Sequence, residues 1–163
     1  MVLAPRDFRD EEYEEPRELL ENNGYDIEVA STQKGVAKGV QGSEAQIDMT
    51  TDEVNPNEYR AIIFIGGPGM SRISEDPVLL SLARKFYKKN RLVAAICIAP
   101  AVLANAGILE NKKATSFPDG REALISGGAD FVEKEVVMDE RIITANGPQA
   151  SQEFAQSILD HLG

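Results

Sequence analysis

Cys97 is the only cysteine in the chain, and its neighbours predict a position where a thiol can be reactive. The apolar run 92–96 indicates a buried strand, and residues 98–107, with Pro100 in the first turn, predict a helix that ends at Gly107. The thiol would then lie on a sharp strand-to-helix turn, pointing out of the sheet toward solvent. Free N–H groups at the helix start favour a thiolate, the nucleophilic form. The alternative is a buried structural cysteine, because cysteine is often part of a core.

Strand and helix patterns alternate along the chain, which predicts an α/β fold with a mostly parallel sheet and helices on both faces. The expected strands are 2–4, 27–30, 61–65 and 92–96, with hairpin-like segments at 35–49 and 136–144; the expected helices are 11–23, 77–89, 98–107 and 148–162. The strand at 2–4 is short for a sheet strand, which indicates either a truncated strand or a translation start upstream of Met1. Sites in such sheets form at the carboxyl ends of the strands, so Gly66-Gly67 and Cys97 should lie near one another.

Composition limits the classes of function. A length of 163 residues suits one domain spanning 1–163, and a formal net charge of −10 argues against nucleic-acid binding. No apolar run is long enough for a membrane span, and no signal peptide is visible. A single cysteine fits a cytoplasmic location, and one cysteine with one histidine is too few for a zinc site. We therefore expect no metal, no cofactor and no membrane partner.

A reactive thiol needs a polarising group nearby, and the sequence offers carboxylates rather than a histidine. The only histidine, His161, is near the chain end and is expected to be a solvated residue at a helix terminus. The acidic run 10–15 opens the first expected helix, after a strand end that should also face the site. Acidic residues are favoured at a helix start by the dipole alone, so these carboxylates need no catalytic role.

Taken together, several segments resemble the DJ-1/PfpI superfamily, the flavodoxin-like group that includes PfpI-type intracellular proteases. The matching segments, in order and spacing, are 8–16, 22–31, 54–59, 65–69, 95–100, 114–118 and 146–148. The resemblance covers nearly the whole chain and implies a flavodoxin-like, three-layer sandwich. It also implies a homo-oligomer, either a dimer or a hexamer.

The resemblance implies roles for four residues. Cys97 matches the family's elbow nucleophile, and Glu12, four residues before Pro16, matches the glutamate that hydrogen-bonds the thiolate. Gly67 and Ile98 would supply the backbone N–H groups of the oxyanion site. The other acidic residues of the run 10–15 keep the interpretation of a solvated helix face.

The chain departs from the family at three positions. Protease-like members have a histidine directly after the elbow cysteine, where this chain has Ile98; other members have one at the position of Phe117. The hexameric proteases bring a glutamate from a neighbouring subunit, and Ser71 stands at the corresponding position here. The site therefore keeps the thiol, the carboxyl group and the oxyanion donors but has none of the family's histidines.

This set of groups favours chemistry on a small α-oxoaldehyde or on its protein adducts, of the glyoxalase or deglycase kind. Such a reaction needs a thiolate and one carboxyl group of raised pKa, and no leaving amine has to be protonated in the glyoxalase step. One alternative is a PfpI-type intracellular cysteine peptidase acting on peptides, with His161 or another group recruited across an interface. Another is a redox-sensing or chaperone-like stress protein in which Cys97 stops at the sulfinic acid.

Overall fold

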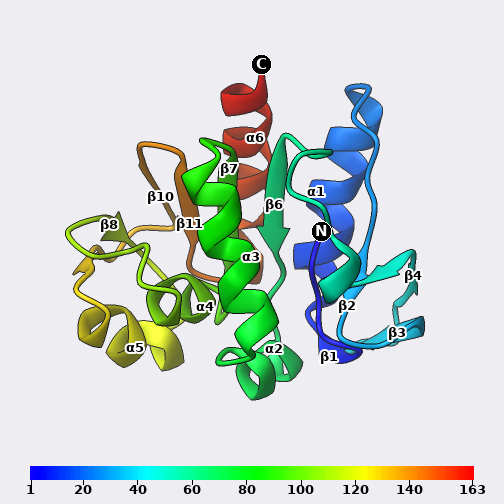
Figure 1. Cartoon of the computed structure of the whole chain (residues 1–163), viewed down its shortest axis with the longest axis horizontal. Coiled ribbons are helices and arrows are strands. Elements are labelled where there is room, and N and C mark those ends of the chain that lie inside the picture. Colours follow the sequence, from blue (N-terminus) through cyan, green and yellow to red (C-terminus); the bar gives the residue numbers. More distant parts are fainter.

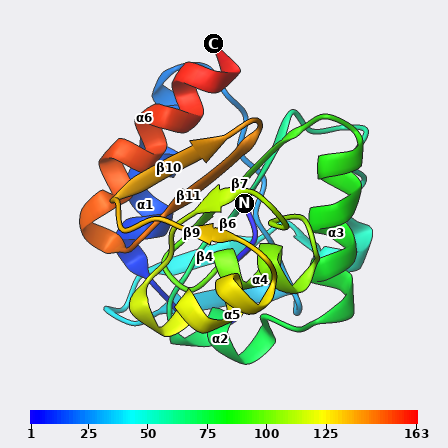
Figure 2. The same cartoon turned by 90° about the vertical axis from the view of Figure 1, so that its left-hand side faces the viewer.

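The computed structural model describes all residues 1–163 and is built around one twisted, mostly parallel sheet (Figures 1 and 2). Its four-stranded part has the order β10 (Val136–Asp139), β11 (Ile142–Ala145), β7 (Leu92–Ile96) and β6 (Ala61–Phe64). Only β10 and β11 pair antiparallel; β11 with β7 and β6 with β7 are parallel. Beyond β6, Val2 bridges to both Phe64 and Ala30, and it joins β6 to the pair β2 (Ala30–Ser31) and β5 (Met49–Thr50).

Alternating side chains divide the apolar interior into two cores, one on each face of the sheet. Along β6, Ile62 and Phe64 pack into one core, while Ile63 and the following Ile65 pack into the other. Successive residues of a strand point to opposite faces, so a continuous apolar run fits a strand covered on both sides. The apolar runs of the sequence therefore became the central strands.

Helices cover both faces, which gives three layers (Figure 2). On one face α1 (Asp10–Asn22) packs against α6 (Ser151–Leu162); the other carries α3 (Pro77–Lys88), α4 (Pro100–Asn105) and α5 (Arg121–Ser126). The short α2 (Pro68–Ile73) lies at the end of the molecule toward which β6 points (Figure 1). No helix combines the length and the apolar character needed to cross a membrane.

Smaller elements complete the chain. β1 (Arg6–Phe8) pairs parallel with β3 (Gly35–Gly39), which forms a hairpin with β4 (Glu44–Ile47), and β8 (Lys113–Ala114) pairs with β9 (Asp130–Phe131). Single 3₁₀ turns are η1 (Thr51–Glu53), η2 (Pro118–Gly120) and η3 (Pro148–Ala150). The buried Asp10 carboxylate accepts hydrogen bonds from the backbone N–H groups of Gln41 and Ser43, both at 2.9 Å. The start of α1 is thus fastened to the β3–β4 hairpin.

The α/β class with helices on both faces is confirmed, and three expected elements are shorter than the sequence predicted. Of the strand at 2–4 only Val2 makes ladder bridges, and of the strand at 27–30 only Ala30 is in a strand. The helix expected at 98–107 is limited to Pro100–Asn105, because Cys97, Ile98 and Ala99 form the turn that leads into it. The last change matters for the chemistry of Cys97.

Candidate active site

Cys97 occupies a strained turn directly after β7. Its φ is 65°, in the left-handed region that a non-glycine residue rarely adopts and that costs roughly 1–3 kcal/mol. Two backbone hydrogen bonds hold this conformation: Cys97 N–H donates to the carbonyl of Ala145 at 2.9 Å, and Phe117 N–H donates to the carbonyl of Cys97 at 2.8 Å. The elbow is therefore fixed by elements from the last third of the chain.

Glu12 lies in the first turn of α1 and is completely buried, with 0% of its surface exposed. Its Oε2 accepts a hydrogen bond from Gly66 N–H at 3.0 Å, and its Oε1 is buried without a hydrogen bond. Pro16 has no N–H to donate to the Glu12 carbonyl, so the helix loses one hydrogen bond there. A buried carboxyl oxygen without a partner is costly, and this indicates a function for Glu12 beyond packing.

The Glu12 carboxyl group and the Cys97 side chain meet above Gly66. A Cβ atom placed on Gly66 would lie 2.6 Å from both Cys97 Cβ and Glu12 Oε2, closer than atoms can approach. Glycine is therefore required here for the two side chains to come together. The structure confirms the expected proximity of Gly66-Gly67 to Cys97.

The backbone N–H groups of Gly67 and Ile98 lie beside the Cys97 side chain, and both lower the pKa of its thiol. Gly67 has a φ of 106°, and a Cβ on it would lie 2.5 Å from the carbonyl oxygen of Asp7, so only glycine fits this close approach. Two N–H groups converging on one point form the kind of site that stabilises a developing oxyanion. All four residues expected from the sequence are thus brought together, and their roles belong to the proposal below.

Burial controls the ionisation of the pair. It raises the pKa of Glu12 to about 8, although the Cys97 thiol and Gly66 N–H act in the opposite direction. Burial also raises the pKa of Cys97, to about 12. The negative charge of Glu12 is the next largest cause in the same direction, and the N–H group of Gly67 lowers the pKa in part. A Glu12 that holds its proton at neutral pH carries no charge to oppose a thiolate.

The sequence-based expectation of a lowered thiol pKa is therefore wrong for the resting protein. That expectation depended on a helix start directly after Cys97. The helix begins only at Pro100 and ends at Asn105, so it adds little beyond the local N–H groups, while desolvation of the sulfur is strong. In the resting protein the sulfur is therefore a thiol, and it lies where it can pass its proton to Glu12.

A cavity of about 460 Å³ opens onto the thiol. Cys97 is only 8% exposed, so its sulfur is more enclosed than the expected solvent-facing position, but it lines this cavity together with Ile98, Phe117 and Ser71. Arg9 also lines the cavity and lowers the pKa of Glu12 by its charge. The sequence offered no signal for Arg9 beyond its place three residues before Glu12.

His161 and the remaining carboxylates of the run 10–15 are not part of this arrangement. His161 is in the last turn of α6, whose end lies at the opposite end of the molecule from α2 (Figure 1). Glu11 is engaged by Arg9, and Glu14 by the Ser43 hydroxyl. No group of three or more His, Cys, Asp or Glu residues is placed to hold a metal ion.

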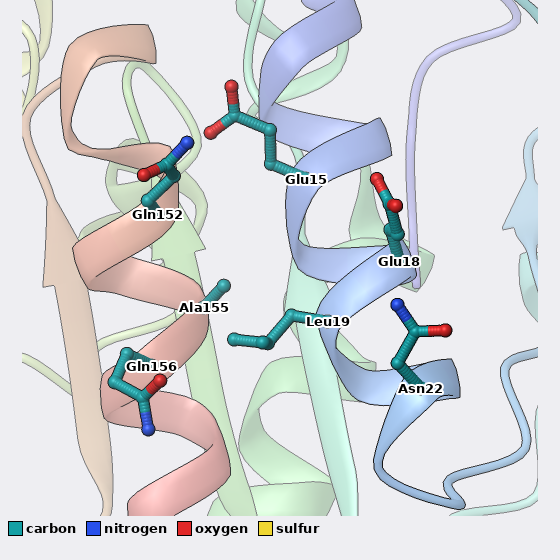
Figure 3. Close-up of a pocket in the computed structure, with 7 residues that line it drawn as sticks. All are labelled: Glu15, Glu18, Leu19, Asn22, Gln152, Ala155 and Gln156. Atoms are coloured by element: carbon teal, nitrogen blue, oxygen red, sulfur yellow. The ribbon is translucent and has the colours of Figure 1, made fainter.

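A second cavity, of about 340 Å³, lies between the outer sides of α1 and α6 (Figure 3). Carboxylates and amides line it, and Leu19 points toward Ala155 across its floor. Burial, followed by the charge of Glu11, raises the pKa of Glu15 on its rim. It contains no nucleophile, so we place the candidate active site at Cys97.

A buried acid beside a cysteine on a strand-to-helix turn, in a parallel α/β sheet, defines a class of proteins built around a nucleophile elbow. Residues 1–161 match the model of the DJ-1/PfpI family. The chain belongs to the DJ-1/PfpI family, as its sequence segments indicated.

Individual relatives agree with this assignment. An uncharacterised protein of Methanocaldococcus jannaschii is 42% identical over 98% of this chain and 79% of its own length. The deglycase PfpI of Pyrococcus furiosus is 33% identical over 91% of this chain and 89% of its own. A glutathione-independent glyoxalase of Caenorhabditis elegans is 29% identical over 99% of this chain and 87% of its own.

Among solved structures, a ThiJ/PfpI domain protein from Brachyspira murdochii superposes with a TM-score of 0.97 at 34% identity. The match covers 99% of this chain and 93% of that chain. The flavodoxin-like fold expected from the sequence is confirmed, and relatives named as a deglycase and as a glyoxalase belong to the matches.

Proposed function

We propose that this chain is a cofactor-independent cysteine enzyme acting on reactive α-oxoaldehydes or on their protein adducts. The observation that carries the proposal is the buried Glu12, whose carboxyl group lies beside the Cys97 side chain, has one oxygen without a hydrogen-bond partner and has its pKa raised to about 8. A carboxyl group that titrates near neutral pH can both accept and return a proton during one turnover. The deglycase and glyoxalase names of relatives support the same class of chemistry.

The first step is addition to the aldehyde. The Glu12 carboxylate takes the thiol proton as the Cys97 sulfur forms a bond to the aldehyde carbon of methylglyoxal. The carbonyl electron pair moves onto oxygen, where the N–H groups of Gly67 and Ile98 stabilise it. Return of the proton from Glu12 to that oxygen completes a hemithioacetal.

The second step moves hydrogen between the two adjacent carbons. The Glu12 carboxylate removes the proton from the carbon bonded to sulfur and passes it to the oxygen of the neighbouring carbonyl, which gives an enediol. Glu12 then takes the hydroxyl proton of the sulfur-bearing carbon and delivers it to the neighbouring carbon, which gives a lactoyl thioester of Cys97. Water cleaves the thioester, the sulfur regains its proton, and the products are lactate and a free thiol. No electron acceptor is required because one carbon is oxidised as the other is reduced.

Peptide hydrolysis fits this site less well. Cleavage of an amide requires a group to protonate the leaving amine, a role usually filled by an imidazolium. His161 lies far from Cys97 within the chain, and the positions of the family's histidines hold Ile98 and Phe117. A peptidase activity would therefore need a group from a second subunit, and assembly into dimers or hexamers stays a prediction.

Lactate formation from methylglyoxal tests the proposed function. We expect Cys97→Ala to lower the rate at least about a hundredfold, because the covalent intermediate cannot form. Far-ultraviolet circular dichroism of the variant checks that the fold is retained. Equal rates for wild type and Cys97→Ala would end the proposal.

A further inference from the structure

One wall of the cavity above Cys97 is apolar and is built by side chains next to the nucleophile in space. Ile98 follows Cys97 directly, and Phe117 donates its backbone N–H to the Cys97 carbonyl at 2.8 Å. Pro68 and Pro148 line the same cavity. The wall is thus attached to the elbow itself and keeps a fixed place relative to the sulfur.

Phe117 is the only phenylalanine of the chain that is exposed, with 40% of its surface accessible. Single exposed apolar residues are common on protein surfaces, but this ring faces a cavity that also contains the only thiol. A Cβ on Gly147 would lie 3.5 Å from Cδ2 of Phe117, so the ring lies beside residue 147 with room for a methyl group between them.

The charged groups of the cavity do not favour an anionic ligand. Arg9 is paired with Glu11, and Arg72 is paired with Asp7. Asp119 lines the cavity as well, and its carboxylate would repel a carboxylate or a phosphate. Both arginines of the cavity already have a carboxylate partner within the protein, whereas the apolar side chains of the wall are free to contact a ligand.

We infer that this cavity selects α-oxoaldehydes with an apolar, ring-sized substituent over methylglyoxal, with Phe117 and Ile98 as the residues that determine the preference. The inference rests on the proposed function. When sulfur bonds to the aldehyde carbon, the substituent on the neighbouring carbonyl extends into the cavity of about 460 Å³, and the methyl group of methylglyoxal fills little of it. A ring there stacks on or packs edgewise against Phe117 and displaces water from Ile98.

Phenylglyoxal is the probe, because it undergoes the same hydrogen shift as methylglyoxal and gives mandelate after hydrolysis of the thioester. We expect kcat/KM for phenylglyoxal to exceed that for methylglyoxal by about tenfold or more, chiefly through a lower KM. Initial rates of mandelate and lactate formation are measured, so that reaction of phenylglyoxal with arginine side chains is not counted as turnover.

Variants at residue 117 locate the preference. Phe117→Ala should reduce the ratio of the two kcat/KM values at least about fivefold, and Phe117→Tyr should keep it, because it retains the ring. Met138→Ala removes another exposed apolar side chain, on β10, and should leave the ratio unchanged. Equal kcat/KM values in wild type, or a ratio that survives Phe117→Ala, would overturn the inference.

A second measurement separates this inference from the proposed function. Cys97 is alkylated with iodoacetamide and with N-phenyl iodoacetamide, and mass spectrometry reports a single site because the chain has one cysteine. Relative to a free thiol, wild type should prefer the aromatic reagent by about fivefold, and Phe117→Ala should lose that preference. If the protein turns over both aldehydes but prefers neither the aromatic aldehyde nor the aromatic alkylating reagent, the apolar wall is contradicted and the proposed function stands. If the aromatic reagent is preferred but no aldehyde is turned over, the proposed reaction is contradicted and the apolar wall is supported.

Discussion

Glu12 and Cys97 face each other across Gly66 and titrate as a coupled pair. Because burial disfavours both negative charges, the first proton to leave as the pH rises comes from the pair near pH 8, and the second leaves only at much higher pH. In the proposed reaction the state with one proton is the reactive one, since the carboxylate can take the thiol proton as the sulfur attacks. The charge of Arg9 favours this state by lowering the pKa of Glu12.

This coupling predicts the pH dependence of turnover. In wild type, kcat/KM for an α-oxoaldehyde should rise with pH and level off above the pKa of Glu12, about 8, because the carboxylate is the base. Glu12→Gln should lower kcat at least about a hundredfold and remove this rise, while iodoacetamide still modifies Cys97. A wild-type profile that is flat from about pH 7 to about pH 9, on the order of one unit either side of that pKa, would contradict the role of Glu12 as base.

At the scale of elements, the position of the Glu12 side chain depends on the hydrogen bonds that hold the first turn of α1 in place. The helix has no side-chain cap at Arg9, and Asp10 instead accepts hydrogen bonds from Gln41 and Ser43 of the β3–β4 connection. A Cβ on Gly39 would lie 2.3 Å from Asp10 Oδ1, so β3 approaches the carboxylate closely. The small β3–β4 hairpin thereby positions the helix that carries Glu12.

Removal of the Asp10 carboxylate should therefore affect both stability and activity. Asp10→Ala leaves two backbone N–H groups without their acceptor, and we expect a loss of about 1–3 kcal/mol in the free energy of unfolding. Turnover should fall as well, because Glu12 is in the same helical turn. Glu18→Ala, an exposed position on the same helix, is the matched control and should change neither quantity. Urea denaturation with parallel rate measurements decides between these outcomes.

The elements themselves were largely predictable from local patterns. Apolar runs identified β6 and β7, and helical spacing with Pro77 at the start identified α3, where Asp76 also caps the helix. The short parallel pairs were not predictable, because Val2 and β2 are strands only by virtue of their neighbours in the sheet. The length of α4 was overestimated because Ile98 and Ala99 have good helical neighbours but are constrained by the elbow.

At the scale of the whole molecule, the topology of the sheet allowed the location of the site to be predicted from the sequence. The pKa values of the groups in the site could not be predicted in the same way. Carboxyl ends of parallel strands meet at one edge, which brought Gly67 and Cys97 together in the prediction and in the structure. The assignment of Glu12 came from the family resemblance rather than from spacing. Desolvation depends on every side chain packed around the sulfur, so the raised pKa of Cys97 could not be obtained from its neighbours in sequence.

Burial of Glu12 also gives the whole fold a dependence on pH. Its pKa is about 8 in the folded protein against 4.5 for the free group, so the folded state binds the proton more tightly. The corresponding stability is fully present below pH 4.5 and is lost as the pH rises through about 8. Relative to Glu12→Gln, wild type should lose a few kcal/mol of unfolding free energy over this range.

Urea denaturation of both proteins at mildly acidic and at alkaline pH measures this loss, and other titrating groups cancel in the difference. A difference that stays constant with pH would show that Glu12 has an ordinary pKa in the folded protein.

The anchoring of the elbow has a consequence for synthesis of the chain. Cys97 leaves the ribosome well before Ala145, whose carbonyl accepts the Cys97 N–H, and before α6, which covers that face of the sheet. The strained backbone at Cys97 has no reason to persist until that partner arrives. A nascent chain that has exposed Cys97 but not yet Ala145 therefore displays an ordinary cysteine, and the strained elbow forms only after β11 has been synthesised.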